Sequence, residues 1–334
     1  MSHEVKNRSP LLAVNHLSVD YVDPPHPPAA ALREITFTLQ RGEALGIVGE
    51  SGCGKSTLML ALMRLLPAAG RIVAGSVRLD GVELLDLDEQ TMAALRWKRI
   101  AMIFQGAMNA LNPVRTVGEQ IAEAIRLHEG VGDRRVLARR VGELLDLVGI
   151  AANRRDQYPF QYSGGMRQRA MIAMALACSP DIVIADEPTT ALDVMIQAQI
   201  LQLLADLRRQ LQLSILLVTH DLGIVAELCD RVLVMYGGVM AEYADADTIY
   251  NSPAHPYTQA LLRAFPDPTR PAQKLAAIPG APPRLNDLPP GCRFAPRCPY
   301  VFARCHMAAP PVYAITPTHS AGCFLVANPQ GGAA

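Results

Sequence analysis

Runs of apolar residues separated by polar turns divide the first part of the chain into predicted strands. Apolar stretches at 12–14 and 17–21, and period-two alternation over 35–39, predict strands near the start. Short runs that are almost wholly apolar predict strands buried on both faces, as in a parallel sheet; they are 44–48, 100–104, 182–185 and 214–219. Polar or charged residues that can bind a ligand or act in catalysis directly follow several of these runs.

Helical spacing accounts for much of the remaining chain. Apolar residues at 58–63 and 170–177 predict buried helices. One face of a further helix carries Ile196, Ile200, Leu203, Leu204, Leu207 and Leu211. Residues 114–160 also favour helices, and their positive charge comes from Arg126, Arg134, Arg135, Arg139, Arg140, Arg154 and Arg155. This basic stretch is typical of a solvated face; the alternative is a docking surface for another protein.

The length and the charge of the chain indicate how many domains it has and which partners it does not attract. The chain has 334 residues, enough for about two domains. Lys plus Arg and Asp plus Glu are balanced at 31 each, so no net charge draws the protein to nucleic acid or an anionic membrane. No apolar run reaches the roughly 18 residues that span a bilayer. The polar start predicts no signal peptide, so we expect a cytoplasmic chain whose seven cysteines form no disulfide framework.

A phosphate-binding loop follows the predicted strand 44–48. It reads Gly49-Glu50-Ser51-Gly52-Cys53-Gly54-Lys55-Ser56-Thr57 and fits the pattern G-x-x-x-x-G-K-[ST]. Its glycines let backbone N–H groups wrap an anion, and the following helix directs its positive end at the phosphates. Lys55 supplies a charge for the β- and γ-phosphates, and Ser56 supplies a hydroxyl for Mg²⁺. The sequence therefore predicts a nucleotide-binding protein.

Two later segments add groups that a nucleotide can use. Ser163-Gly164-Gly165 begins a predicted helix and offers a second set of free N–H groups. The apolar strand 182–185 delivers Asp186 and Glu187 at its carboxyl end, where open α/β sheets bind ligands. Asp186 suits Mg²⁺, and Glu187 suits the orientation or deprotonation of water. His220 follows the strand 214–219, and it lies near the γ-phosphate if the two strands are neighbours.

In this order and spacing, the segments resemble the ATPase subunits of ABC transporters over about residues 11–250. The matching motifs are the Walker A loop 49–57, the Q-loop glutamine Gln105, the signature 163–168, Walker B at 182–187, the D-loop Ala191-Leu192-Asp193 and the switch histidine His220. The signature is the discriminating motif, because many other ATPases carry Walker A and B. Tyr162 stands where the family usually has leucine.

The resemblance implies a fold and a shared ATP site. It implies an α/β fold, a P-loop ABC ATPase with a parallel core sheet, an antiparallel β subdomain and a helical subdomain at about 106–178. The nucleotide-binding domain would cover residues 1–265, and a small irregular cysteine-rich extension would cover 266–334. ATP would lie between two heads bound head to tail, with Walker A, Walker B and His220 of one head facing Ser163, Gly164 and Gly165 of the other.

The resemblance also implies roles for single residues. Tyr21, otherwise interpreted as a packed strand aromatic, matches the ring that stacks on adenine. Glu187 becomes the catalytic base, and Gln105 links the γ-phosphate and Mg²⁺ to the membrane subunits. Asp193 of the D-loop joins the residues that bind the nucleotide. The implied Mg²⁺ ligands are Ser56, Gln105 and Asp186.

The last part of the chain narrows the resemblance to one branch. Residues 252–262 and 291–299 are similar to the C-terminal extension of dipeptide and oligopeptide importer ATPases, and Phe104-Gln105 with Met108 and 111–113 fits the same branch. Members typically work as a heterodimer of two related ATPases under two membrane permease subunits, fed by a solute-binding protein. The resemblance thus implies a peripheral protein on the cytoplasmic face of the inner membrane, without a nucleic-acid partner. Nickel, glutathione and oligosaccharides are alternative cargoes in this branch.

Four cysteines crowd the extension, namely Cys292, Cys298, Cys305 and Cys323. Four thiolates can hold a [4Fe–4S] cluster or tetrahedral zinc. The uneven spacing C-x5-C-x6-C-x17-C lacks the close knuckles of structural zinc sites and favours a cluster; zinc and unligated thiols are the alternatives. His306 is a spare ligand.

Two other function classes compete with an importer ATPase. Soluble ABC proteins that act on DNA or ribosomes tend to carry two cassettes, a long coiled-coil insertion or a basic surface, and this chain shows none of these. Exporter ATPases often include membrane helices in the same chain, and the sequence offers none. The sequence therefore favours the importer.

Overall fold

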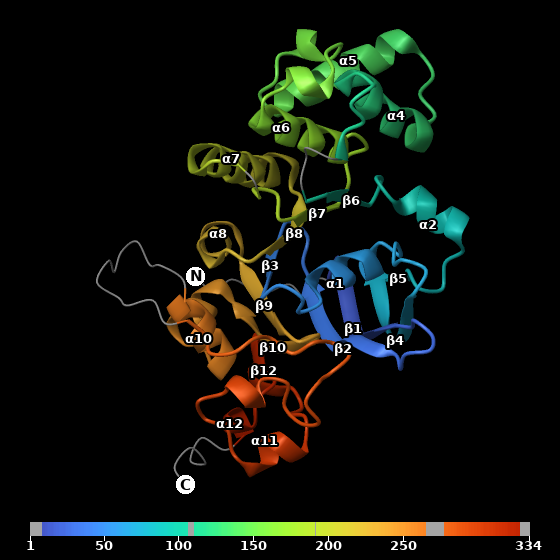
Figure 1. The fold of residues 1–334 in the computed structure, drawn as a ribbon. Coiled ribbons are helices and arrows are strands. Elements are labelled where there is room, and N and C mark those ends of the chain that lie inside the picture. Colours follow the sequence, from blue (N-terminus) through green and yellow to red (C-terminus); the bar gives the residue numbers. More distant parts are fainter. Residues whose placement is uncertain (1–8, 106–109, 191, 265–276, 328–334) are drawn as a thin grey trace. The chain divides into compact units, whose positions relative to one another are not determined.

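The computed structural model describes residues 9–105, 110–190, 192–264 and 277–327 (Figure 1). The chain divides into two units: Met1–Leu87 with His220–Ala334, and Asp88–Thr219. The first unit holds the predicted phosphate-binding loop and the cysteine-rich extension. The second holds the predicted signature and Walker B segments.

An antiparallel sheet forms one part of the first unit. Its strands, in spatial order, are β2 (Ala29–Leu39), β1 (Leu12–Tyr21), β4 (Gly70–Leu79) and β5 (Val82–Glu83). The two apolar stretches predicted near the start belong to one strand, β1, whose register with β2 shifts between Val14 and Leu17. His16 lies in that shift with a positive φ of 48°, which gives the strand a local irregularity that apolar periodicity alone does not indicate.

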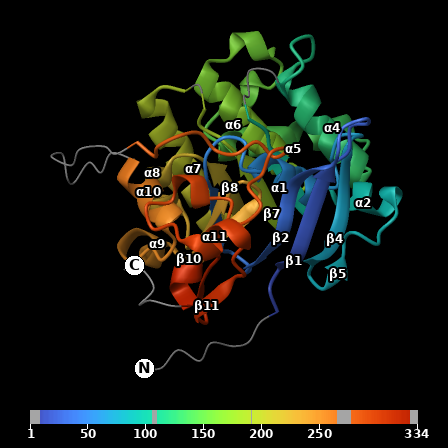
Figure 2. The same cartoon turned by 60° about the horizontal axis from the view of Figure 1, so that its bottom comes forward.

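A second sheet of the same unit carries the extension. β3 (Ala44–Val48) pairs in parallel with β9 (Arg231–Tyr236), and β9 pairs antiparallel with β10 (Val239–Asp245). The extension adds β12 (His319–Ala321) and β11 (Tyr313–Thr316) beyond β10, also antiparallel, and Figure 2 shows these red elements against β10. The unit's helices are α1 (Lys55–Leu62), α8 (Leu222–Leu228), α9 (Ala246–Asn251), α10 (Pro256–Ala264), the 3₁₀ turn η3 (Ala295–Arg297), α11 (Ala303–Met307) and α12 (Phe324–Ala327).

Parallel strands and a group of helices form the second unit. β6 (Ile100–Ile103), β7 (Ile182–Asp186) and β8 (Ser214–Thr219) lie side by side in that order, and each pair is parallel. Their apolar side chains are almost all buried, as their continuous apolar runs predict. The helices are α2 (Glu89–Leu95), α4 (Val117–Glu129), α5 (Arg134–Leu147), η1 (Ala152–Arg154), η2 (Pro159–Gln161), α6 (Gly164–Ala175) and α7 (Val194–Leu211).

The helices of the second unit begin at polar capping residues. Thr116 and Glu119 form a reciprocal capping box at the start of α4, and Asp133 accepts hydrogen bonds from the first N–H groups of α5. Arg140 of the basic stretch pairs with Glu129, and Arg139 lies 3.8 Å from Glu143. Part of the basic charge is therefore balanced within the helices. No described helix has both the length and the apolar character needed to cross a membrane.

Candidate functional site

The loop between β3 and α1 has the backbone shape that its glycines permit. Gly49 has φ of +151°, and a Cβ there would lie 2.2 Å from the Met235 carbonyl oxygen, so a side chain is excluded. Gly54, just before α1, has φ of +102°. Lys55 Nζ donates to the carbonyl oxygens of Gly49 (2.6 Å) and Glu50 (3.1 Å), which folds the lysine over the loop.

Some residues of the loop are exposed, so a ligand can reach them, and others are buried. Ser51, Gly52 and Ser56 are exposed, whereas Cys53 is buried beneath them. Burial raises the pKa of the Cys53 thiol above its ordinary value, although nearby Lys55 acts in the opposite direction. The thiol is therefore uncharged at neutral pH and leaves the positive charge of Lys55 uncancelled.

Tyr21 lies at the end of β1 beside the helix that follows the loop. Its hydroxyl is 3.3 Å from the Thr57 hydroxyl oxygen, and its ring is partly exposed. The contact brings the predicted adenine-stacking ring to the same side of the first unit as Thr57 of the loop. A strand aromatic and the phosphate-binding segment, 36 residues apart, are thus neighbours.

Glu187, directly after β7, is held by two side chains of the second unit. Its Oε2 accepts hydrogen bonds from Gln105 Nε2 (2.8 Å) and from the Thr190 hydroxyl (2.9 Å). The residue has a positive φ of 44°, a left-handed conformation that costs a non-glycine residue free energy and is frequent at functional sites. Gln105 and Glu187 were both predicted to be catalytic, and the structure brings them together. A role for Thr190 was not predicted from the sequence. Its position three residues after Glu187 was the one feature of the sequence that could have indicated this contact.

The signature segment begins α6 and packs on the start of α7. Ser163 is the N-cap of α6, where its hydroxyl accepts from the Met166 N–H at 3.3 Å. A Cβ on Gly165 would lie 2.8 Å from Ile196 Cγ2, so glycine allows the close approach of the two helices. Asp193 caps α7 by accepting from the Ile196 N–H at 2.9 Å. Tyr162, in the family's leucine position, is buried and donates to the Arg154 carbonyl oxygen.

Two other predicted site residues lie at the carboxyl ends of parallel strands. Asp186 is the last residue of β7, and β7 pairs in parallel with β8, so the expectation that these strands are neighbours is confirmed. His220 follows β8 directly and is exposed, and Asp221 next to it caps α8. Ala191 and Met108 lie outside the described residues.

Two cysteines of the extension lie in one small apolar core. Cys305, Ala295 and Phe324 are buried together, with Cys292, Phe302 and Tyr313 packed against them. The Cys292 N–H donates to the Cys305 carbonyl oxygen at 2.8 Å, and Cys323 precedes Phe324. Burial, and then the neighbouring thiols, raise the pKa of Cys298 and of Cys323 to about 11. Among the described residues, no three His, Cys, Asp or Glu side chains are already grouped to hold a metal ion.

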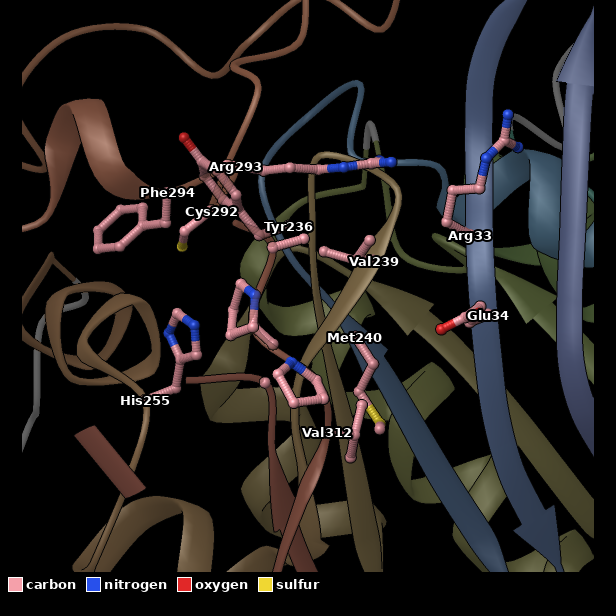
Figure 3. A pocket seen from close by; sticks show the side chains of 16 residues that line it. Arg33, Glu34, Tyr236, Val239, Met240, His255, Cys292, Arg293, Phe294 and Val312 are labelled. Carbon is pink, nitrogen blue, oxygen red and sulfur yellow. The ribbon is translucent and has the colours of Figure 1, made fainter. Parts of the chain in front are cut away.

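A cavity separates this extension from the strands that it covers. It has a volume of about 230 Å³. Figure 3 shows Cys292, Arg293 and Phe294 on one side with His255, and Arg33 and Glu34 of β2 on the other. Burial lowers the pKa of His255 to about 4, so the ring is neutral in its packed position.

A phosphate-binding loop, a glycine-rich signature helix and a buried strand ending in two carboxylates define a P-loop ATPase of the ABC class. Comparison of the sequence with known protein families supports this class. Residues 32–190 match the family described as ABC transporter, and residues 241–305 match the oligopeptide/dipeptide transporter C-terminal region.

Curated relatives and solved structures cover most of the chain. A probable peptide ABC transporter ATP-binding protein of Sinorhizobium fredii is 50% identical over 88% of this chain and 89% of its own. The oligopeptide transport ATP-binding protein of Salmonella typhimurium is 48% identical over 94% and 93%, and the dipeptide transport ATP-binding protein of Escherichia coli is 46% identical over 96% and 98%. The dimeric structure of a bacterial ABC transporter cassette matches with a TM-score of 0.63 and 28% identity, over 70% of this chain and 98% of that one.

The chain therefore belongs to the ABC transporter family, as an ATP-binding subunit that also carries the C-terminal region described for oligopeptide/dipeptide transporters. The predicted family, the predicted ABC ATPase fold and the predicted ATPase activity are confirmed. The exact domain limits and the roles of single residues stay predictions.

Proposed function

We propose that this protein hydrolyses ATP to power the uptake of di- or oligopeptides through partner membrane subunits. The observation that carries the proposal is the combination, in one chain, of the ABC motifs and the extension that matches over residues 241–305. Relatives that align over almost the whole chain have names referring to peptide, oligopeptide and dipeptide transport. The extension matters most here, because the ATPase motifs alone do not indicate a cargo.

In the proposed mechanism, the predicted site residues bind ATP and Mg²⁺ and position the attacking water. The loop N–H groups and Lys55 bind the β- and γ-phosphates, and the Tyr21 ring stacks on adenine. Glu187, held by Gln105 and Thr190, orients a water molecule and accepts its proton, while His220 contacts the γ-phosphate. Ser56, Gln105 and Asp186 are oxygen donors of the kind Mg²⁺ prefers, and the ion would neutralise phosphate charge when bound.

We also propose how the subunit is assembled. Ser163, Gly164, Gly165 and Asp193 would face the ATP held by a second ABC ATPase subunit, in a heterodimer beneath two membrane permease subunits, with a solute-binding protein supplying cargo. The subunit would be peripheral, on the cytoplasmic face of the inner membrane. The exposed side chains of Val194 and Met195, at the start of α7 next to Asp193, support a covered surface at this place.

Uptake in cells that lack this gene tests the cargo. Labelled dipeptides, longer peptides, nickel, glutathione and oligosaccharides would each be supplied to deletion cells and to cells carrying the gene on a plasmid. We expect peptide uptake to fall on deletion and to return with the gene. If peptide uptake is unchanged and another cargo is lost, the peptide assignment is wrong.

We further propose that Cys292, Cys298, Cys305 and Cys323 hold a metal centre, with a [4Fe–4S] cluster favoured over zinc. Cys292 and Cys305 share one small apolar core, and neighbouring thiols contribute to the raised pKa of Cys298 and of Cys323. Four thiolates are a suitable donor set for either metal, and such a centre would stabilise a segment with few large apolar residues. Binding would displace the thiol protons and would need the side chains to turn toward a common centre.

Replacing Cys298 with serine should remove this metal and loosen the extension while largely sparing ATP binding, because the substitution keeps Arg297, the neighbouring residue whose guanidinium pairs with Glu50 of the loop. Iron and zinc content of anaerobically purified protein, with hydrogen exchange over 291–305, measures both effects. Cys178→Ser, which changes a buried thiol of the other unit, is the matched control. Wild-type protein with neither element at stoichiometric level would contradict the metal centre.

A further inference from the structure

One arginine of the extension reaches the phosphate-binding loop. Arg297, the last residue of η3, donates from Nη1 to Glu50 Oε2 (2.6 Å) and from Nη2 to Glu50 Oε1 (3.0 Å). The two residues are 247 positions apart in the sequence. Paired N–H donors on both oxygens of one carboxylate form the bidentate arrangement that guanidinium groups favour. Glu50 is the second residue of the loop, so the extension holds the loop directly.

The guanidinium of Arg297 is itself fixed in place. Its Nε donates to the Pro279 carbonyl oxygen at 2.7 Å, and its Nη1 also donates to the Tyr236 hydroxyl at 3.2 Å. The side chain is only 5% exposed, whereas that of Glu50 is 25% exposed. Burial alone would lower the pKa of Arg297, but the hydrogen bonds with Glu50 and Tyr236 raise it overall, so the group stays charged.

Glu50 is held through its backbone as well. Its N–H donates to the Tyr257 hydroxyl at 2.9 Å, and Tyr257 is fully buried. The Tyr257 ring packs against Tyr236 and Phe294, with ring centroids 4.6 and 5.4 Å apart. Phe294 belongs to the same extension segment as Arg297. The backbone and the side chain of Glu50 are therefore both fixed by groups outside the loop.

The carboxylate of Glu50 presents a difficulty for a loop that binds phosphate. A negative charge beside the phosphate-binding N–H groups repels a triphosphate unless a cation neutralises it. Lys55 contacts the Glu50 carbonyl oxygen, and it is Arg297 that pairs with the carboxylate. We propose that Arg297 is a positioning residue for ATP binding, which neutralises Glu50 and keeps the loop in its binding conformation.

This inference rests on the proposed ATP site, and equilibrium binding of a fluorescent ATP analogue to the full-length protein with Mg²⁺ tests it. Arg297→Gln should raise the Kd roughly three- to tenfold, with the maximal rate of ATP hydrolysis changed by less than about twofold. Arg297→Lys, which keeps the charge but loses the bidentate contact, should lie between this variant and the wild type. Arg304→Gln changes an exposed arginine of the same extension, over the Phe324 ring, and should have no effect.

A double variant separates positioning from general damage. If the unpaired Glu50 carboxylate is what weakens binding, Arg297→Gln/Glu50→Gln binds ATP more tightly than Arg297→Gln alone. Damage to folding would not be reversed by the second change. An unchanged Kd in both Arg297 variants, or purely additive losses in the double variant, would overturn the inference while leaving the ATP site in place. Failure of the wild-type protein to bind ATP would instead overturn the proposed site.

Discussion

The Glu187→Gln variant is expected to lose at least ~10²-fold in ATP turnover while it still binds ATP, the usual scale for removal of a positioned general base. Glutamine keeps the size of the side chain and can still accept from Gln105 and Thr190, which hold the carboxylate at 2.8 and 2.9 Å. It cannot take a proton from water. Glutamine is the same size as glutamate and is no more strained at the positive φ of residue 187, so we expect the loss to come from chemistry and not from the backbone.

Phosphate release by the assembled transporter measures this effect. Glu143→Gln is the matched control, because it makes the same chemical change on an exposed face of α5 in the same unit. We expect the control to match the wild type. Wild-type turnover in a folded Glu187→Gln transporter would exclude Glu187 as the base and direct attention to His220.

The Lys55→Ala variant is expected to bind ATP roughly 10²-fold more weakly, because it removes a charged donor from a nearly buried position in the loop. The ammonium group that now contacts the Gly49 and Glu50 carbonyl oxygens is the one that would turn to the phosphates. The loss therefore appears in the binding constant itself, unlike that of Glu187→Gln.

Titration with a fluorescent ATP analogue measures this constant. Lys98→Ala removes an exposed lysine of the other unit and is the matched control. A thermal unfolding curve would show that each variant is folded. A folded Lys55→Ala protein with the wild-type Kd would show that the lysine does not contact the nucleotide.

Much of the fold follows from local sequence. The run 44–48 is apolar throughout and forms β3 with the predicted bounds, and the runs at 182 and 214 form the neighbouring parallel strands β7 and β8. The loop 49–57 was predictable because glycines and a lysine at this spacing, between a strand and a helix, are typical of a phosphate-binding loop. The helix α7 keeps Ile200, Leu204 and Leu207 buried on the expected face, whereas Leu211 is 42% exposed near the end of the helix.

Contacts between distant segments could not be predicted in this way. The pairing of Arg297 with Glu50 depends on the fold of the extension, and each residue alone is an ordinary charged residue. The left-handed backbone of Glu187 depends on its surroundings, since glutamate has no local preference for it. The buried Glu242 joins β10 to the extension, because its Oε1 lies 2.8 Å from His319 Nε2. The pattern of apolar residues likewise does not predict this contact.

ATP hydrolysis at this site is proposed to drive peptide uptake. The most direct measurement follows phosphate release and labelled peptide accumulation together, in vesicles containing the complete transporter with either wild-type or Glu187→Gln protein. We expect both signals with wild-type protein and ATP, and neither with the variant or without ATP. Peptide accumulation that continues in the Glu187→Gln vesicles would show that hydrolysis at this site does not drive uptake.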